Sequence, residues 1–295
     1  MSNSSLYDNS TSAGGRVRPL WYKYPECVVS PQPFAFYFAC KVINLVVGTP
    51  SNIFVIWQIA SKKKNTSTSD IFFLNLAVLD AYFCLTTPID LVNRLELENE
   101  QIWIFQRIAY GVKDMAPLFL VCICVDRYMA VVHPVFFSSY QETITRVCVC
   151  IIIWGLIMPY SIIKGIHGIL SVTGIFGGVI LFAFAVMIFC NISVIWVLRH
   201  AVVGKEKMHP VKKRAFKMVL KNLGIIVFNY LPPVAFMPFV PYYTRFQYLC
   251  LISISVFAVM DLSCSIEPLL YISKSEGLSG PCCKKASEAP ADVKV

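Results

Sequence analysis

The sequence predicts an all-α membrane protein in which seven transmembrane helices form one bundle. Of its 295 residues, 57% are hydrophobic and only 15% are charged, whereas a soluble domain has about 25% charged residues. The apolar residues are grouped in seven stretches, each long enough for a helix of about 20 residues to cross a hydrocarbon core about 30 Å thick. Helices are expected because a backbone in lipid must satisfy its hydrogen bonds within the segment.

These stretches divide the chain into three parts. We expect spans at 34–60, 71–94, 103–132, 146–164, 170–198, 215–240 and 248–272. Residues 1–33 are then an extracellular tail, 34–272 the transmembrane domain and 273–295 a short cytoplasmic tail. The fourth and fifth spans are the hardest to separate, because Lys164 is the only charged residue between Cys148 and Leu198. We place the turn at 164–168, where glycines favour it.

The third and sixth spans contain residues that are unusual in a helix in lipid. Arg107, Lys113 and Asp114 lie in the outer half of the third span, and a charge near the bilayer centre costs on the order of several kcal/mol unless it faces protein or water. We therefore expect these side chains to point into the bundle. Pro117 and the pair Pro232-Pro233 remove backbone donors and should kink their helices.

The basic residues predict the orientation. With the N-terminus outside, 17 of the 26 lysines and arginines fall on the cytoplasmic side, which agrees with the excess of positive charge found in cytoplasmic loops. Seven crossings then place the C-terminus inside. The net charge of +9 is spread over short loops rather than one folded face, so membrane lipids are expected as partners and nucleic acid is not.

Several residues outside the spans are candidates for modification. Asn3 and Asn9 begin glycosylation sequons on the outer side. Cys27 and Cys250 lie where the compartment is oxidising, so they either form a disulfide or stay unpaired. Cys282 and Cys283 follow the last span, where we expect lipidation, and free thiols are the alternative. Apart from Cys250, which lies at the outer start of the last expected span, eight of the twelve cysteines fall inside spans and are expected to be packing residues.

Six sequence motifs occur in a fixed order, one in each of six spans. They are Gly48 to Asn52, Asn75 to Asp80, Asp126-Arg127-Tyr128 followed by His133-Pro134, Trp154, Leu231-Pro232, and Glu267 to Tyr271. In this order they resemble the motifs of rhodopsin-like (class A) G-protein-coupled receptors over nearly the whole chain. Thr86-Thr87-Pro88 and the acid before Pro268 resemble the purinergic, lipid-mediator and hydroxy-acid branch of that family.

The resemblance implies a receptor of the plasma membrane, not an enzyme. Such a receptor binds an extracellular ligand and activates a heterotrimeric G protein when the cytoplasmic end of the bundle opens. Arg127 is expected to pair with Asp126 at rest and to leave it on activation. The residues implied in coupling and switching are Asp126, Arg127, Tyr128, Tyr230, Pro232, Pro268 and Tyr271.

Three departures from the family pattern leave a second interpretation open. No cysteine stands at the outer start of the third span, which reads Gln101 to Ile104, so the usual bridge to the second outer loop cannot form. That loop is also shortened, and Asn191 replaces the tyrosine of the fifth span. The alternative is therefore a receptor-like protein that does not signal and acts as a decoy or heteromer partner.

Four acids, Asp80, Asp114, Asp261 and Glu267, lie at membrane depth. Uncompensated carboxylates are very unfavourable there, so some must be protonated or bound to a cation. By resemblance, Asp80 belongs to a sodium site, to which Glu267 adds a second carboxylate. We expect the two to share a proton or a sodium ion, and a neutral, hydrogen-bonded Glu267 is the alternative. No other cofactor is expected.

Lys113, Tyr110, Asp261, Arg94 and Tyr230 are the candidate ligand-binding residues. We expect Lys113 to form an ion pair with Asp261 across the pocket floor, either as a structural contact or as a pair that a ligand opens. Basic residues near the mouth then favour a small anionic ligand such as a nucleotide, carboxylate or lipid mediator. They are Arg94, Arg107, Lys164 and His167. An amine is disfavoured because Ala109 stands where amine receptors have an acid.

Other classes of seven-span or membrane protein fit less well. A retinal protein needs a Schiff-base lysine in its last span, and residues 248–272 contain none. The four histidines are scattered and form no pattern expected of an enzyme site. Transporters often contain inverted repeats, and we find none in the sequence.

Overall fold

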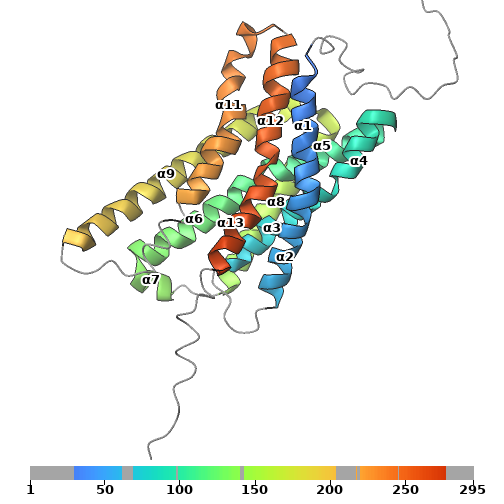
Figure 1. The fold of residues 1–295 in the computed structure, drawn as a ribbon. Helices are drawn as coiled ribbons and strands as arrows, with labels where there is room; N and C mark the ends of the chain where they lie inside the picture. The colour runs from blue at the N-terminus through green and yellow to red at the C-terminus, as the bar shows by residue number, and fades with distance from the viewer. Residues whose placement is uncertain are drawn as a thin grey trace, which may run out of the picture.

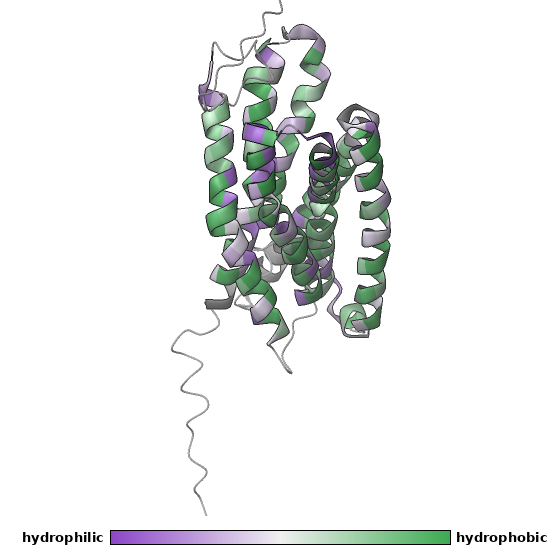
Figure 2. Cartoon of the chain, turned by 90° about the vertical axis from the view of Figure 1, so that its right-hand side faces the viewer, coloured by the Kyte–Doolittle hydropathy of each residue, from purple (hydrophilic) through white to green (hydrophobic). Residues whose placement is uncertain are grey.

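The computed structural model describes residues 30–61, 69–97, 99–139, 143–203, 220–244 and 246–276, together with Lys217. Seven helical segments in these ranges are long and apolar enough to cross a membrane: Gln32–Ala60, Asp70–Val92, Glu100–Val132, Thr143–His167, Thr173–Val197, Leu220–Tyr242 and Cys250–Ser273. They form one bundle (Figure 1), and apolar residues predominate along them (Figure 2). The predicted all-α seven-helix bundle is confirmed.

Most spans consist of more than one helical piece. In chain order the described elements are α1 (Gln32–Ile43), η2 (Asn44–Gly48), α2 (Thr49–Ala60), α3 (Asp70–Leu85), α4 (Thr87–Val92), η3 (Asn93–Leu97), α5 (Glu100–Asp114), α6 (Ala116–Val132), α7 (Pro134–Ser139), α8 (Thr143–His167), η4 (Ile169–Val172), α9 (Thr173–Val203), η5 (Ile226–Tyr230), α11 (Leu231–Phe236), η6 (Met237–Tyr242), η7 (Gln247–Ser253), α12 (Ile254–Asp261) and α13 (Ser263–Glu276).

Prolines account for several of these breaks. Proline lacks a backbone N–H and clashes with the carbonyl four residues earlier, so the disturbance lies before it. The third span is interrupted at Met115, two residues before Pro117, and the sixth span has a π-helical turn, η5, just before Pro232. Both prolines for which a kink was predicted therefore lie next to an interruption of the regular α-helix. Pro50 likewise follows the π-helical turn η2.

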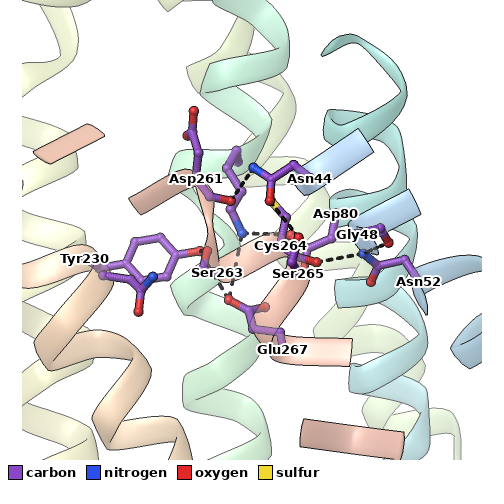
Figure 3. Close-up of polar contacts among 12 residues, drawn as sticks. Asn44, Gly48, Asn52, Asp80, Tyr230, Asp261, Ser263, Cys264, Ser265 and Glu267 are labelled. Atoms are coloured by element: carbon purple, nitrogen blue, oxygen red, sulfur yellow. Dashed lines mark hydrogen bonds and ion pairs between the residues drawn. The ribbon is translucent and has the colours of Figure 1, made fainter. Parts of the chain in front are cut away.

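Two asparagines of the first span bond carbonyls that the seventh span leaves without their usual donors. Pro268 has no N–H for the carbonyl of Cys264, and Asn52 Nδ2 donates to that oxygen at 2.9 Å. At the break between α12 and α13, Ser265 N donates to Leu262 O, and Asn44 Nδ2 donates to Asp261 O at 2.8 Å (Figure 3). The first span is therefore fastened to the seventh at both irregularities.

The turn between the fourth and fifth spans lies at the end of the predicted interval. Gly168 has a φ of 85°, a conformation that glycine adopts without the steric penalty of a side chain. Lys164, Gly165 and His167 remain in the last turn of α8. The predicted division of the long apolar stretch is thus confirmed, with the turn starting later than expected.

The outer half of the third span packs closely against α8. Arg107 Nε donates to Gly165 O at 3.0 Å, and both Tyr160 and Lys164 bond Asp114. Gly111 lies so near Ser161 that a Cβ on the glycine would be 2.7 Å from the Ser161 Cα. This interface holds the third span in the region where the sequence lacks the family's cysteine.

Cys250 is buried and disulfide-bonded, while the eight other described cysteines are free. Its partner is therefore not among the described residues. Cys27, Asn3, Asn9, Cys282 and Cys283 all lie outside them. The pairing of Cys27 with Cys250, the glycosylation, the lipidation and the two tail boundaries stay predictions.

We predict that Gly111→Ala lowers thermal stability, because the added methyl group meets the backbone of Ser161 and overpacking of this kind costs about 1–3 kcal/mol. The melting temperature of the purified full chain is the measurement. Gly155→Ala on α8 is the matched control, since a Cβ there has no neighbour within 4 Å, and it should melt at or slightly above the wild-type temperature. Equal melting temperatures for the two variants would contradict the close α5 to α8 contact.

Candidate functional site

In the described part of the chain, three buried lysine–aspartate pairs join different spans inside the bundle. Their N to O distances are 2.9 Å for Lys41 and Asp261, 2.7 Å for Lys113 and Asp80, and 2.5 Å for Lys164 and Asp114. None of these six side chains is more than 6% exposed. Charges at this depth need such partners. The prediction that Lys113 and Asp114 face the interior is confirmed, while Arg107 is only partly buried and also bonds Glu100.

The predicted ion pair between Lys113 and Asp261 is wrong. Lys113 instead contacts Asp80 and, at 3.8 Å, Glu267, and Asp261 contacts Lys41. The reason is that Asp261 already has a cation partner from the first span, and Lys113 lies against the acid of the second span instead. Sequence reasoning passed over Lys41, although a single lysine inside an apolar span is itself a signal that an acid lies opposite.

Six residues form a second polar group, which we call the Tyr37 cluster: Tyr37, Lys41, Asp90, Arg94, Tyr110 and Asp261. Tyr37 is at its centre, because its hydroxyl donates to Asp90 Oδ2 at 2.9 Å and lies 2.6 Å from the hydroxyl of Tyr110. Arg94 Nε donates to the other Asp90 oxygen at 2.8 Å. The cluster therefore ties together the first three spans and, through Asp261, the seventh.

Aromatic rings cover both cations of the Tyr37 cluster. Lys41 Nζ lies 4.3 Å from the ring centroid of Phe83 and 4.5 Å from that of Tyr110, and the Arg94 guanidinium lies 4.7 Å from the Trp103 ring. Contacts of this kind stabilise a partly desolvated cation. The Arg94 side chain is 27% exposed, whereas Lys41 is almost fully buried. Arg94 is thus the more exposed of the two cations of this cluster.

The structure separates the five predicted ligand residues into two groups. Arg94, Tyr110 and Asp261 belong to the Tyr37 cluster, as described above. Lys113 and Tyr230 belong to a deeper group with Asp80, Ser263 and Glu267, which we call the central cluster. Lys164, predicted near the mouth, is instead buried against Asp114.

The central cluster is almost completely enclosed. Ser263 Oγ donates to the Tyr230 hydroxyl at 3.1 Å, and that hydroxyl lies 3.5 Å from Glu267 Oε1 (Figure 3). Lys113 Nζ lies between Asp80 and Glu267 and 5.4 Å from the centroid of the Tyr230 ring. The two acids expected to act together are therefore joined through one ammonium group.

At the opposite end of the bundle, Asp126 is held by two other spans. Ser69 Oγ donates to Asp126 Oδ2, and Arg146 donates to Oδ1 through Nε and Nη2, both at 3.0 Å. Sequence reasoning did not foresee either partner, although Arg146 is a charged residue near the start of the fourth span. Arg127 is half-buried, and its pairing with Asp126 stays a prediction.

The remaining predicted switch residues also contact neighbouring spans. The Tyr271 hydroxyl donates to Asp70 Oδ1 at 3.2 Å, and its ring packs on Phe73 at a centroid distance of 4.8 Å. The Tyr128 hydroxyl lies 3.3 Å from Nε2 of His133 at the end of its own helix, and the Tyr128 ring centroid is 5.7 Å from that of Phe189 on the fifth span. Among the motif residues, Trp154 Nε1 donates to Asn75 Oδ1 at 2.9 Å. The motif residues are thus residues that connect spans.

Comparison with known proteins agrees with this architecture. Residues 51–169 match the family model described as 7 transmembrane receptor (rhodopsin family). The chain is 29% identical over 132 residues to proteinase-activated receptor 3 of Rattus norvegicus, a match that covers 42% of this chain and 35% of the rat protein. The family model and this relative describe receptors rather than enzymes.

Two further relatives are receptors of other kinds. C-X-C chemokine receptor type 1 of Oryctolagus cuniculus is 30% identical over 165 residues, which are 52% of this chain and 44% of the relative. A purinoceptor of Homo sapiens is 26% identical over 164 residues, or 52% of this chain and 42% of the relative. The matched part therefore spans less than half the length of each of these curated relatives.

The human purinoceptor belongs to the purinergic branch that the sequence motifs resemble, whereas similarity to a chemokine receptor was not predicted. The motif residues lie in the matched segment and beyond it, and several of them bond side chains or carbonyls of other spans. Together, the match over residues 51–169 and the seven helices that are long and apolar enough to cross a membrane make this chain similar to the rhodopsin-like (class A) seven-transmembrane receptors, which are multi-pass proteins of the plasma membrane.

Proposed function

We propose that this chain is a G-protein-coupled receptor that binds an extracellular ligand at the Tyr37 cluster and activates a heterotrimeric G protein at the end that carries Asp126-Arg127-Tyr128. The observation that carries the proposal is a set of contacts between spans at the end of the bundle that contains Asp126. Asp126 of the third span is tied to Ser69 and Arg146, and Tyr271 of the seventh span is tied to Asp70. These are hydrogen bonds and ion pairs that an opening of the bundle would exchange for others.

The basic residues of the loops predict the orientation of the chain in the membrane. With the N-terminus outside, the Tyr37 cluster faces the cell exterior and Asp126 faces the cytosol, in agreement with the charge distribution of the loops. A ligand shifts the equilibrium toward the open form only by binding that form more tightly. Contacts of the second and fourth spans with Asp126 favour the closed form in this scheme, and releasing them would make Arg127 accessible to a G protein.

We further propose that the ligand is small and anionic. Arg94 presents its guanidinium to Asp90 and is partly exposed, and a ligand carboxylate or phosphate can replace an aspartate as a partner of this planar donor. The cluster contains two cations and two carboxylates. An anion would therefore be recognised by exchange with Asp90, which would also release Tyr37.

A non-signalling receptor-like partner is the second candidate, and one observation favours it. Asn191, which stands where the family has a tyrosine, is buried and donates to the Met187 carbonyl of its own helix at 2.8 Å. A side chain bound in this way does not help to stabilise an open form of the bundle. The missing outer cystine gives weaker support, because the α5 to α8 contact holds the third span in place.

We predict opposite effects of two substitutions on G-protein dissociation in cells that express the full chain without added ligand. Arg127→Ala should abolish the basal signal, because the G protein loses its contact. Ser69→Ala removes one donor from Asp126 and should raise the signal, by up to about tenfold if the lost bond contributes about 1.5 kcal/mol.

Surface expression is matched among the variants of this assay. Ser171→Ala is the control for the serine, since that exposed hydroxyl bonds only the nearby Gly168 carbonyl among its described contacts. The control should leave the signal unchanged. A wild-type chain and a Ser69→Ala variant that are both silent would favour the non-signalling candidate over a receptor.

The ligand class is tested with a nucleoside triphosphate, a hydroxycarboxylate and a lysophospholipid as probes. Any of these that activates the wild type should lose potency by about tenfold or more in Arg94→Ala, because a charge-assisted hydrogen bond contributes about 1.5–3 kcal/mol. Arg94→Lys should recover only part of the loss, since lysine lacks the planar fork. An agonist from this set whose potency is the same in Arg94→Ala would contradict the anionic site and leave G-protein coupling intact.

A further inference from the structure

Lys113 places a positive charge between two buried carboxylates. Its Nζ is 2.7 Å from Asp80 Oδ1 and 3.8 Å from Glu267 Oε1, and the three side chains are 0%, 0% and 3% exposed. The residues come from α5, α3 and α13, so three separate spans meet at one ammonium group. In lipid, this arrangement replaces the solvation that water would give to each charge.

The family resemblance implies a sodium ion beside Asp80, but the residues around it do not fit one. The ammonium of Lys113 already lies against the Asp80 carboxylate, and two unit charges 4 Å apart repel by about 4 kcal/mol at an effective dielectric constant of 20. A hard cation also needs several oxygen ligands. Ala116 stands where the family has a serine, and it offers no side-chain oxygen.

The position of Lys113 is fixed by its neighbour. Lys113 and Asp114 are consecutive and oppositely charged, yet each pairs with a different span: Lys113 with Asp80 and Asp114 with Lys164. Consecutive residues of a helix point in different directions, so these two pairs together determine the rotation of α5 about its axis. A rotation of α5 that moved Lys113 away from Asp80 would therefore also strain the pair on the other side.

We propose that Lys113 is a built-in cation that takes the place of a bound metal ion in this receptor. The chain is then insensitive to sodium, and a monovalent cation site appears only when the ammonium is removed. Asp80 Oδ2 and Glu267 Oε2 have no hydrogen-bond partner among the residues that the structure describes, so both carboxylates keep an oxygen that a cation can use.

The experiment compares thermal unfolding of the purified full chain in sodium chloride and in choline chloride at the same ionic strength. The wild type should melt at the same temperature in both salts. Lys113→Met keeps the length of the side chain but removes its charge, and it should melt about 3 °C or more higher in sodium, because an ion bound only by the folded state stabilises it. A wild-type melting temperature that rises in sodium would overturn the proposal.

Lys164→Met is the matched control. It also removes a buried ammonium, but only one carboxylate remains there, that of Asp114, which Tyr160 also bonds. This variant is therefore expected to melt at the same temperature in both salts. A folded Lys113→Met variant that melts equally in both salts would also overturn the proposal. These readouts do not depend on a ligand or a G protein, so they are independent of the proposed signalling.

If Lys113→Met does not fold, the double variant Asp80→Asn/Lys113→Met tests whether Lys113 neutralises Asp80. Removing one partner of a buried pair leaves an uncompensated charge, whereas removing both is often tolerated. The double variant should therefore give more folded protein than Lys113→Met alone. A double variant that folds no better would show that Lys113 does not neutralise Asp80.

Discussion

The arrangement of the seven helices depends on the pairing of charges that a bilayer cannot solvate. Lys41 with Asp261, Lys113 with Asp80 and Lys164 with Asp114 each join two spans. Together they connect the first span to the seventh, the second to the third and the third to the fourth. Each pair fixes the rotation of its helices, because a charge turned toward lipid would lose its partner at a cost on the order of several kcal/mol.

The seventh span carries both Asp261 and Glu267 (Figure 3) and so takes part in both polar clusters. Asp261 contacts Lys41 in the Tyr37 cluster, and Glu267 contacts Lys113 in the central cluster. Between them α12 gives way to α13, and Asn44 supplies a donor for the carbonyl of Asp261. A ligand bound at the Tyr37 cluster, as proposed, would therefore act on a span whose backbone is already irregular and which also carries Tyr271.

Hydropathy and proline chemistry were sufficient to predict the spans, the inward direction of Lys113 and Asp114, and the interruptions near Pro117 and Pro232. These two kinds of reasoning did not predict which charged side chains pair with one another. A sequence gives the depth of each charge in the bilayer, but the rotation of each helix about its axis decides which charges meet. For this reason the acid paired with Lys113 was misassigned, Lys41 was missed, and Arg146 was not foreseen beside Asp126.

The dependence of the bundle on its charge pairs is tested most directly by a double-mutant cycle on Lys41 and Asp261, measured as thermal stability of the purified chain. Lys41→Met and Asp261→Asn should each destabilise the protein, because each leaves the other group poorly compensated. The double variant should lose clearly less than the sum of the two, with a coupling of about 1–3 kcal/mol. Losses that simply add would contradict the claim that this pair holds the first and seventh spans together.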